Sequence, residues 1–168
     1  MYIFAQILGI VALCCSVCSF QQNNHKRILF FQILSGTLFT IHFTMIGATL
    51  GGVLNLIGTF RSIVFYNKDK KWANGTKWLY IFSGIFIITG IFFWEGYISL
   101  LPMVSMVIST VCFWVTNPKK VRLLMLPASP LWLVYNLINK SIGGFLTESF
   151  VLCSVIVGMI RFDFKNKS

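Results

Sequence analysis

The chain has 168 residues, of which 57% are hydrophobic and 11% are charged, and its mean hydropathy is +0.80. A soluble domain carries about 25% charged residues, so this composition excludes a soluble globular protein and predicts a chain that lies in lipid. The formal net charge is +10, but the basic residues are scattered over connecting segments and form no single stripe, which argues against nucleic-acid binding.

Seven apolar runs follow one another along the chain: residues 2–20, 28–46, 50–66, 78–94, 97–115, 121–138 and 142–160. Each approaches the roughly 20 residues that cross a bilayer core. Continuous runs of this length are typical of helices, because a helix satisfies its own backbone hydrogen bonds within the membrane. The predicted fold is an all-α membrane protein with seven transmembrane helices.

The first apolar run contains three of the five cysteines and is interpreted as a membrane helix. It has no basic segment before it and no small-x-small cleavage site after it, so it does not resemble a cleaved signal. All five cysteines, 14, 15, 18, 112 and 153, fall inside apolar runs, where they are expected to pack as small residues. Cys15 and Cys18 form a C-x-x-C pair, but no βαβ pattern surrounds them, so neither redox chemistry nor a metal site is predicted.

The two halves of the chain share landmarks at an interval of 93 residues. Two polar corners that contain glycine, residues 42–52 and 135–144, are followed by Asn55 and Glu148 respectively. At the same interval Phe20 matches Phe113, Lys26 matches Lys119, Leu38 matches Leu131, Phe39 matches Trp132, His42 matches Tyr135 and Gly51 matches Gly144. The pattern indicates a duplicated half within a single integral membrane domain, residues 1–168. Residues 1–66 form the first three-helix repeat, 78–94 an inverting linker helix, and 97–160 a second repeat of the same orientation.

The basic residues predict the orientation of the helices in the membrane. Thirteen of the fourteen lysines and arginines lie on or beside alternate connections, and Lys140 lies on the other side. Because cytoplasmic loops are rich in Lys and Arg, we expect the N-terminus outside and the C-terminus in the cytoplasm. Arg61 falls about one turn from the cytoplasmic end of its helix, where its side chain is expected to extend toward lipid phosphates.

Three stretches of the chain resemble a known family of membrane proteins. SFQQNNHKRILFFQIL, which begins at Ser19, is followed by IHFTMIGATLGGVLNLIGTFRSIVFY from Ile41 and KDKKW from Lys68. These stretches, with their Ser-Phe-Gln-Gln corner and Gly-x-x-x-Asn-x-x-Gly-x-x-Arg motif, resemble the YgjV family of bacterial inner-membrane proteins. The resemblance covers most of the chain and implies an inner-membrane location, but it implies no established activity.

The arrangement of three, one and three helices with an external N-terminus is similar to the SWEET and PQ-loop carriers of small solutes. Those carriers have a Pro-Gln pair at the end of the first helix, where this chain has Gln21 and Gln22. They also place an Asn on the third helix of each half, facing the sugar. Asn55 resembles that residue, whereas the matching position holds Glu148, a departure that would change the substrate or add ion coupling.

Polar groups within apolar runs are costly, and each is a candidate for function. Asn55 can bind a hydroxylated solute through its donors and acceptor, or it can join helices. Glu148 can bind a proton, or it can be a hydrogen-bonded structural carboxyl. His42, Tyr135 and Asn136 suit an outer vestibule or an interfacial anchor, and Phe39 and Trp132 suit stacking on a sugar ring or packing of a core. Pro127 and Pro130 should bend the sixth helix, as a gating hinge or as ordinary kinked packing.

The sequence therefore favours a carrier of a small polar or sugar-like solute, facilitative or proton-linked, working by alternating access between its halves. The rival interpretation is a non-transporting accessory or scaffold protein with the same fold. No phosphate loop, carboxylate pair or histidine pair is present in the sequence, so no enzyme, metal site or cofactor is expected. The expected partners are the lipid bilayer and a small polar solute, with no nucleic acid.

Overall fold

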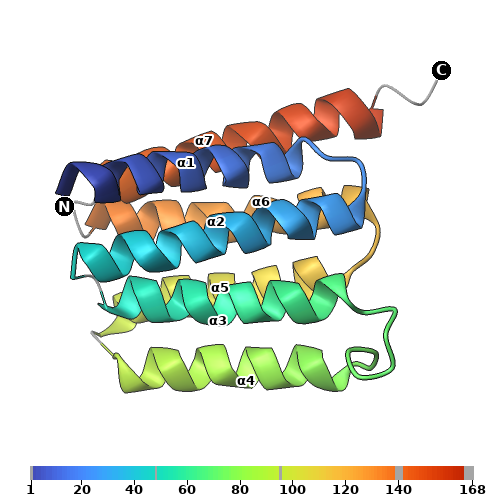
Figure 1. Ribbon diagram of the computed structural model, residues 1–168, viewed down its shortest axis with the longest axis horizontal. Coiled ribbons are helices and arrows are strands. Elements are labelled where there is room, and N and C mark those ends of the chain that lie inside the picture. The colour runs from blue at the N-terminus through green and yellow to red at the C-terminus, as the bar shows by residue number, and fades with distance from the viewer. Residues whose placement is uncertain (1, 48, 95, 139–141, 165–168) are drawn as a thin grey trace.

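The computed structural model describes residues 2–47, 49–94, 96–138 and 142–164, and these residues contain seven α-helices (Figure 1). They are α1 (Tyr2–Phe20), α2 (His25–Met45), α3 (Thr49–Tyr66), α4 (Lys77–Phe92), α5 (Leu100–Trp114), α6 (Pro118–Ile138) and α7 (Ile142–Met159). A short 3-10 turn, Tyr97–Ser99, precedes α5, and a π-helical turn, Ile160–Phe164, follows α7. The seven helices predicted from the apolar runs are confirmed.

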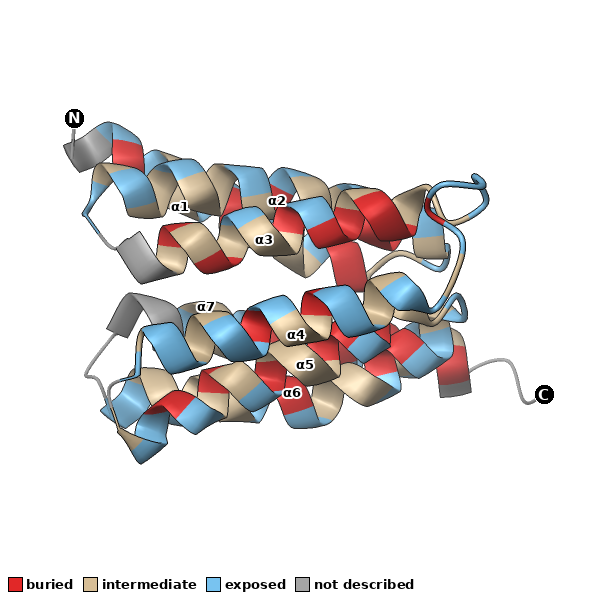
Figure 2. Cartoon of the chain, turned by 90° about the horizontal axis from the view of Figure 1, so that it is seen from below, coloured by how far each residue is buried: buried red, intermediate tan, exposed pale blue. Residues whose placement is uncertain are grey.

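The helices lie side by side along one long axis, and six of them form a ring. Helix α2 packs between α1 and α3, and α6 packs between α5 and α7. The two sets meet where α1 contacts α7 and where α3 contacts α5, so the ring closes. Figure 2 shows α1–α3 in one layer and α4–α7 in the other. Helix α4 lies outside the ring, against α5 and α3, and exposes Tyr80, Ile88, Ile91 and Phe92.

Helix ends recur at the interval that the sequence landmarks show. Helices α2 and α6 begin at residues 25 and 118 and end at 45 and 138, and α3 and α7 begin at 49 and 142 and end at 66 and 159, so each pair of ends is 93 residues apart. An asparagine side chain also accepts a backbone hydrogen bond at the start of both α2 and α6, although the donor is the third residue on in α2 and the second in α6. The side chain of Asn24 accepts a hydrogen bond from the Arg27 amide at 3.2 Å, and Asn117 accepts one from the Lys119 amide at 3.0 Å.

Hydrogen bonds between the first two helices of each set recur in the same way. The Ser19 hydroxyl donates to the Ile28 carbonyl at 3.0 Å, and the Cys112 thiol donates to the Val121 carbonyl at 3.1 Å. In a second pair of corresponding bonds, the second helix of the first set supplies the donor, whereas the first helix of the second set supplies it. Ser35 of α2 donates to Ala12 of α1, whereas Ser105 of α5 donates to Ala128 of α6, both at 2.8 Å.

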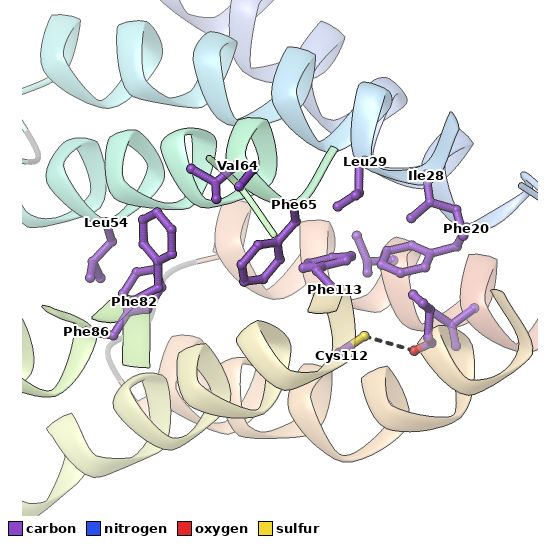
Figure 3. Packing of buried hydrophobic residues seen from close by; sticks show 14 residues of the cluster. Phe20, Ile28, Leu29, Leu54, Val64, Phe65, Phe82, Phe86, Cys112 and Phe113 are labelled. Carbon is purple, nitrogen blue, oxygen red and sulfur yellow. Dashed lines mark hydrogen bonds between the residues drawn. The ribbon is translucent and has the colours of Figure 1, made fainter. Parts of the chain in front are cut away.

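The apolar core is concentrated where the two sets meet. Phe20 and Phe113 stack with ring centroids 6.5 Å apart, and Phe113 lies beside Phe65 in Figure 3. The same figure shows the thiol bond of Cys112, which holds the end of α5 against α6. Both stacked rings are almost fully buried, so they fill the interface between the sets at this level.

Basic residues gather at the end of the bundle where α1, α3, α5 and α7 finish, which we call the basic end. It carries Lys26, Arg27, Lys68, Lys70, Lys71, Lys77, Lys119, Lys120, Arg122 and Arg161; Lys140 lies outside the described residues. Arg122 is fully buried there and donates two hydrogen bonds to Asp163, at 2.9 and 2.6 Å, and one to the Gln22 carbonyl. This contact ties α6 to the corner between α1 and α2 and to the turn after α7.

Candidate solute site

A cavity of about 150 Å³ lies inside the helical ring, with room for roughly ten water molecules by the volume that one water needs. All six ring helices contribute to its lining, and α4 does not. The lining residues are Ser16, Phe20, Gln32, Ser35, Gly36, Phe39, Leu54, Asn55, Gly58, Arg61, Ser62, Ser105, Met106, Ser109, Phe113, Met125, Ser129, Trp132, Thr147, Glu148 and Val151. Eleven of them have polar side chains, so the cavity gathers many polar groups within an apolar bundle.

Most of the lining falls into pairs of residues that are 93 apart. The pairs are Ser16 and Ser109, Phe20 and Phe113, Gln32 and Met125, Gly36 and Ser129, Phe39 and Trp132, Leu54 and Thr147, Asn55 and Glu148, and Gly58 and Val151. Five lining residues, Ser35, Arg61, Ser62, Ser105 and Met106, fall outside these pairs. Corresponding positions of the two helix sets therefore face the same cavity.

Asn55 and Glu148 come to this cavity from α3 and α7. The Asn55 amide donates to the Gly51 carbonyl at 2.8 Å, a bond within its own helix that fixes the side chain and leaves its oxygen available. Helices α2 and α3 pack closely near Asn55, because a Cβ at Gly36 would overlap the Thr59 hydroxyl and lie 3.5 Å from the Asn55 carbonyl oxygen. Glu148 makes no ion pair or hydrogen bond with any residue that the structure describes.

Arg61 also lines the cavity, where the sequence suggested a side chain reaching toward lipid headgroups. Only 5% of the residue is exposed, and its guanidinium lies between the rings of Phe86 and Phe113, 5.3 and 5.1 Å from their centroids. Its Nη1 donates to the hydroxyls of Ser109 and Thr110, both at 3.0 Å. Its Nε is buried with no hydrogen-bond partner, as is the hydroxyl of Ser129.

The structure separates the remaining candidate residues. Phe39 and Trp132 line the main cavity, whereas Tyr135 lines a second pocket of about 20 Å³ beside Phe86 and Pro102. His42 is bonded to the Ala5 carbonyl at 2.7 Å and packs against Gly9, so it joins α2 to α1. Asn136 is half-buried on α6 and lines neither pocket.

Two other sequence features lie near the cavity or in the same helices. Pro127 and Pro130 lie inside α6, which continues as one helix from Pro118 to Ile138, and they flank the cavity-lining Ser129. Within the described residues, no group of three or more His, Cys, Asp and Glu side chains is placed to hold a metal ion. The cysteines that the structure describes are free thiols.

Length and composition suit these helices to a bilayer. Four segments of the described chain are long and apolar enough to cross a membrane: His25–Met45, Tyr97–Trp114, Pro118–Ile138 and Phe145–Asp163. Phe4–Phe20 and Lys77–Phe92 are shorter apolar helices. Helices of this length and composition could cross a bilayer several times.

The chain belongs to the Imp-YgjV family, described as bacterial inner membrane protein, whose family model matches residues 3–166. It is similar to the inner membrane protein YgjV of Escherichia coli (strain K12), with 21% identity over 161 residues, which cover 96% of this chain and 85% of that protein. No solved structure matches the chain. Family membership and the apolar helices together place the protein in the bacterial inner membrane.

Proposed function

We propose that this inner-membrane protein is a carrier of a small polar solute, built from two three-helix repeats that surround one binding cavity. The repeats are residues 1–66 and 97–160. The linker is residues 78–94, most of which belong to α4 (Lys77–Phe92), and it returns the chain to the face where the first repeat began. The observation that carries the proposal is the lining of the cavity by eight pairs of residues 93 apart. In carriers with parallel repeats, the solute site lies between the repeats near the middle of the bilayer.

Alternating access requires contacts that can break and reform between the two sets. Between the sets, α1 meets α7 and α3 meets α5, and these are the sparser contacts of the ring. On the basic side of the cavity, contacts between the sets include the Phe20 and Phe113 stack and the bonds from Gln21 to Ser154, at 2.7 and 3.0 Å. Rocking one set against the other would open this side without unfolding either set.

The experiment is a melting screen followed by counterflow. Purified protein is heated with sugars, amino acids and organic acids, and any solute that raises the melting temperature is tested for counterflow in proteoliposomes. We expect at least one solute to do both, and we expect Asn55→Ala to abolish the melting shift. Ser149→Ala is the matched control, because Ser149 neighbours Glu148 but bonds to the Phe145 carbonyl and does not line the cavity.

A proton-linked form of the carrier is tested in the same liposomes at two pH values. Glu148 supplies the one carboxyl group among the lining residues, so counterflow that depends on pH should become independent of pH in Glu148→Gln. If no solute both shifts melting and exchanges, the protein is instead a non-transporting accessory or scaffold. If shifts persist unchanged in Asn55→Ala, the solute binds elsewhere.

A further inference from the structure

Arg61 carries a buried charge for which no described residue supplies a counter-ion. The only ion pairs among the described residues join Lys26 to Asp69 and Arg122 to Asp163. Hydroxyls of Ser109 and Thr110 hold one nitrogen of the guanidinium, and aromatic rings cover its faces. Leaving a charge uncompensated in such a place is costly, so an anion in the cavity would stabilise it.

The geometry of Arg61 distinguishes it from an arginine that serves only as a membrane anchor. An anchoring side chain extends toward the bilayer surface and keeps its charge in water. Arg61 instead stays within the ring and bonds across the set boundary to α5. With Nη1 occupied by hydroxyls and Nε without a partner, the guanidinium is oriented by the protein but retains donors for a ligand.

The same cavity also holds the carboxyl group of Glu148 on α7, which likewise has no ion-pair partner among the described residues. Arg61 follows Asn55 by six residues, about 9 Å along the axis of α3. Because Asn55 and Glu148 are corresponding residues of the two sets, the cation and the carboxylate lie at different depths on different walls. The cavity thus presents one guanidinium and one carboxyl group, together with other polar side chains.

We propose that the solute is a small zwitterion of the free amino acid class. This inference rests on the carrier function proposed above. The solute's carboxylate would bind the Arg61 guanidinium, and its ammonium would bind the Glu148 carboxylate and the Asn55 oxygen. A neutral sugar would leave the Arg61 charge unpaired, and a simple anion would offer no cation to the Glu148 carboxyl. A solute with both charges pairs with Arg61 and stabilises the ionised form of Glu148, which favours it over either alternative in a cavity of low dielectric constant.

The first test uses wild-type protein and probes that differ in one charge. Each of the twenty protein amino acids is titrated at millimolar concentrations while the melting temperature is followed. The best binder is then compared with its hydroxy acid, which lacks the ammonium, and with its amino alcohol, which lacks the carboxylate. We expect each analogue to bind at least tenfold more weakly. Failure of all twenty amino acids, or equal binding of either analogue, would overturn the proposal.

Variants assign each end of the solute to a residue. Arg61→Gln should abolish discrimination between the amino acid and its amino alcohol, and Arg61→Lys should restore part of it. Glu148→Gln should abolish discrimination between the amino acid and its hydroxy acid. Phe60→Leu is the control on α3, since Phe60 neighbours Arg61 but faces away from the cavity and is 56% exposed. If the variants still bind the amino acid more tightly than its amino alcohol and its hydroxy acid, Arg61 and Glu148 do not bind the solute.

Phosphatidylethanolamine carries the same two charges, so titrations are made in phosphatidylglycerol bilayers with and without this lipid. Competition between the lipid and the amino acid at Arg61 would overturn the assignment to a free solute.

Failure of the zwitterion inference can be distinguished from failure of the carrier function. If a sugar binds and exchanges while no amino acid does, the carrier function stands and the zwitterion inference fails. If nothing exchanges, the carrier function itself fails.

Discussion

At the scale of single residues, the absence of a side chain at Gly158 allows α7 to pack closely against two other parts of the chain. A Cβ atom there would lie 2.5 Å from the backbone carbonyl oxygen of Phe20 and 3.0 Å from Cδ of Arg122. The backbone oxygen cannot rotate away as a side chain can. Close approach at this point brings the end of α7 beside the α1 corner and the buried Arg122 and Asp163 pair.

Replacing Gly158 by alanine should therefore destabilise the protein. Overpacking costs about 1–3 kcal/mol, which outweighs the gain of up to about 1 kcal/mol from alanine's better helix propensity. Gly84→Ala on α4 is the control, because a Cβ there meets nothing within 4 Å, and this variant should be at least as stable as the wild type. Denaturant titration in micelles measures the free energy of unfolding of both variants. Equal stability of the two variants would show that α7 does not pack as closely as described.

Sequence identified some cavity residues and missed others, for physical reasons that differ between them. Asn55 and Glu148 were found because a polar group in an apolar run is costly wherever it lies. Arg61 was placed at the lipid surface because its depth in α3 allows that reach. Its burial depends on Phe86 of α4 and Phe113 of α5, which are distant in sequence. The sequence suggests an outer vestibule or an interfacial anchor for His42, but Gly9 lets α1 approach its ring.

At the scale of the helices, apolar runs predict where each helix lies, but two helices begin earlier than their runs. Helix α2 starts at His25 and α6 at Pro118, each three residues before its apolar run, because Asn24 and Asn117 cap the first turn. Proline suits a first helical turn, where its missing amide hydrogen would have no partner within the helix. The first turns of these helices contain lysine or arginine, so a search for apolar runs does not include them.

The corner between α5 and α6 offers a test of correspondence between the two sets. Cys112 and Ser19 are both fully buried and donate equivalent bonds, so Cys112→Ser should keep the bond and alter the free energy of unfolding by less than about 0.5 kcal/mol. Cys112→Ala, which loses both the bond and contact volume, should lower it by about 1 kcal/mol. Denaturant titration compares the variants. A serine variant as unstable as the alanine variant would contradict the correspondence.

At the scale of the whole molecule, the arrangement of the ring depends on contacts that no local pattern encodes. A repeat interval of 93 residues can be read from landmarks, and it predicts that two sets have the same internal packing. It does not predict that α1 meets α7, that α3 meets α5, or that α4 lies outside. Those pairings determine which polar residues share a cavity. They also explain why Tyr135 lines a different pocket from Glu148.

Charge distribution over the whole bundle predicts its orientation in the membrane. All the lysines and arginines that the structure describes, apart from the buried Arg61, lie toward the basic end, and Figure 1 shows the N-terminus at the opposite end. Basic segments are retained in the cytoplasm, where the anionic leaflet also attracts them. We therefore expect the basic end to face the cytoplasm and the N-terminus to face the periplasm.

Cysteine labelling tests this orientation in a background that lacks the native cysteines, Cys14, Cys15, Cys18, Cys112 and Cys153. A single cysteine is introduced at Asn74, exposed in the loop after α3, or at Tyr97, which is 86% exposed at the opposite end. A membrane-impermeant maleimide applied to spheroplasts should label Tyr97→Cys at once, and Asn74→Cys only after the membrane is permeabilised. Each variant serves as the control for the other. Labelling of Asn74→Cys in sealed spheroplasts would reverse the orientation, because the Asn74 loop would then face the periplasm despite its lysines.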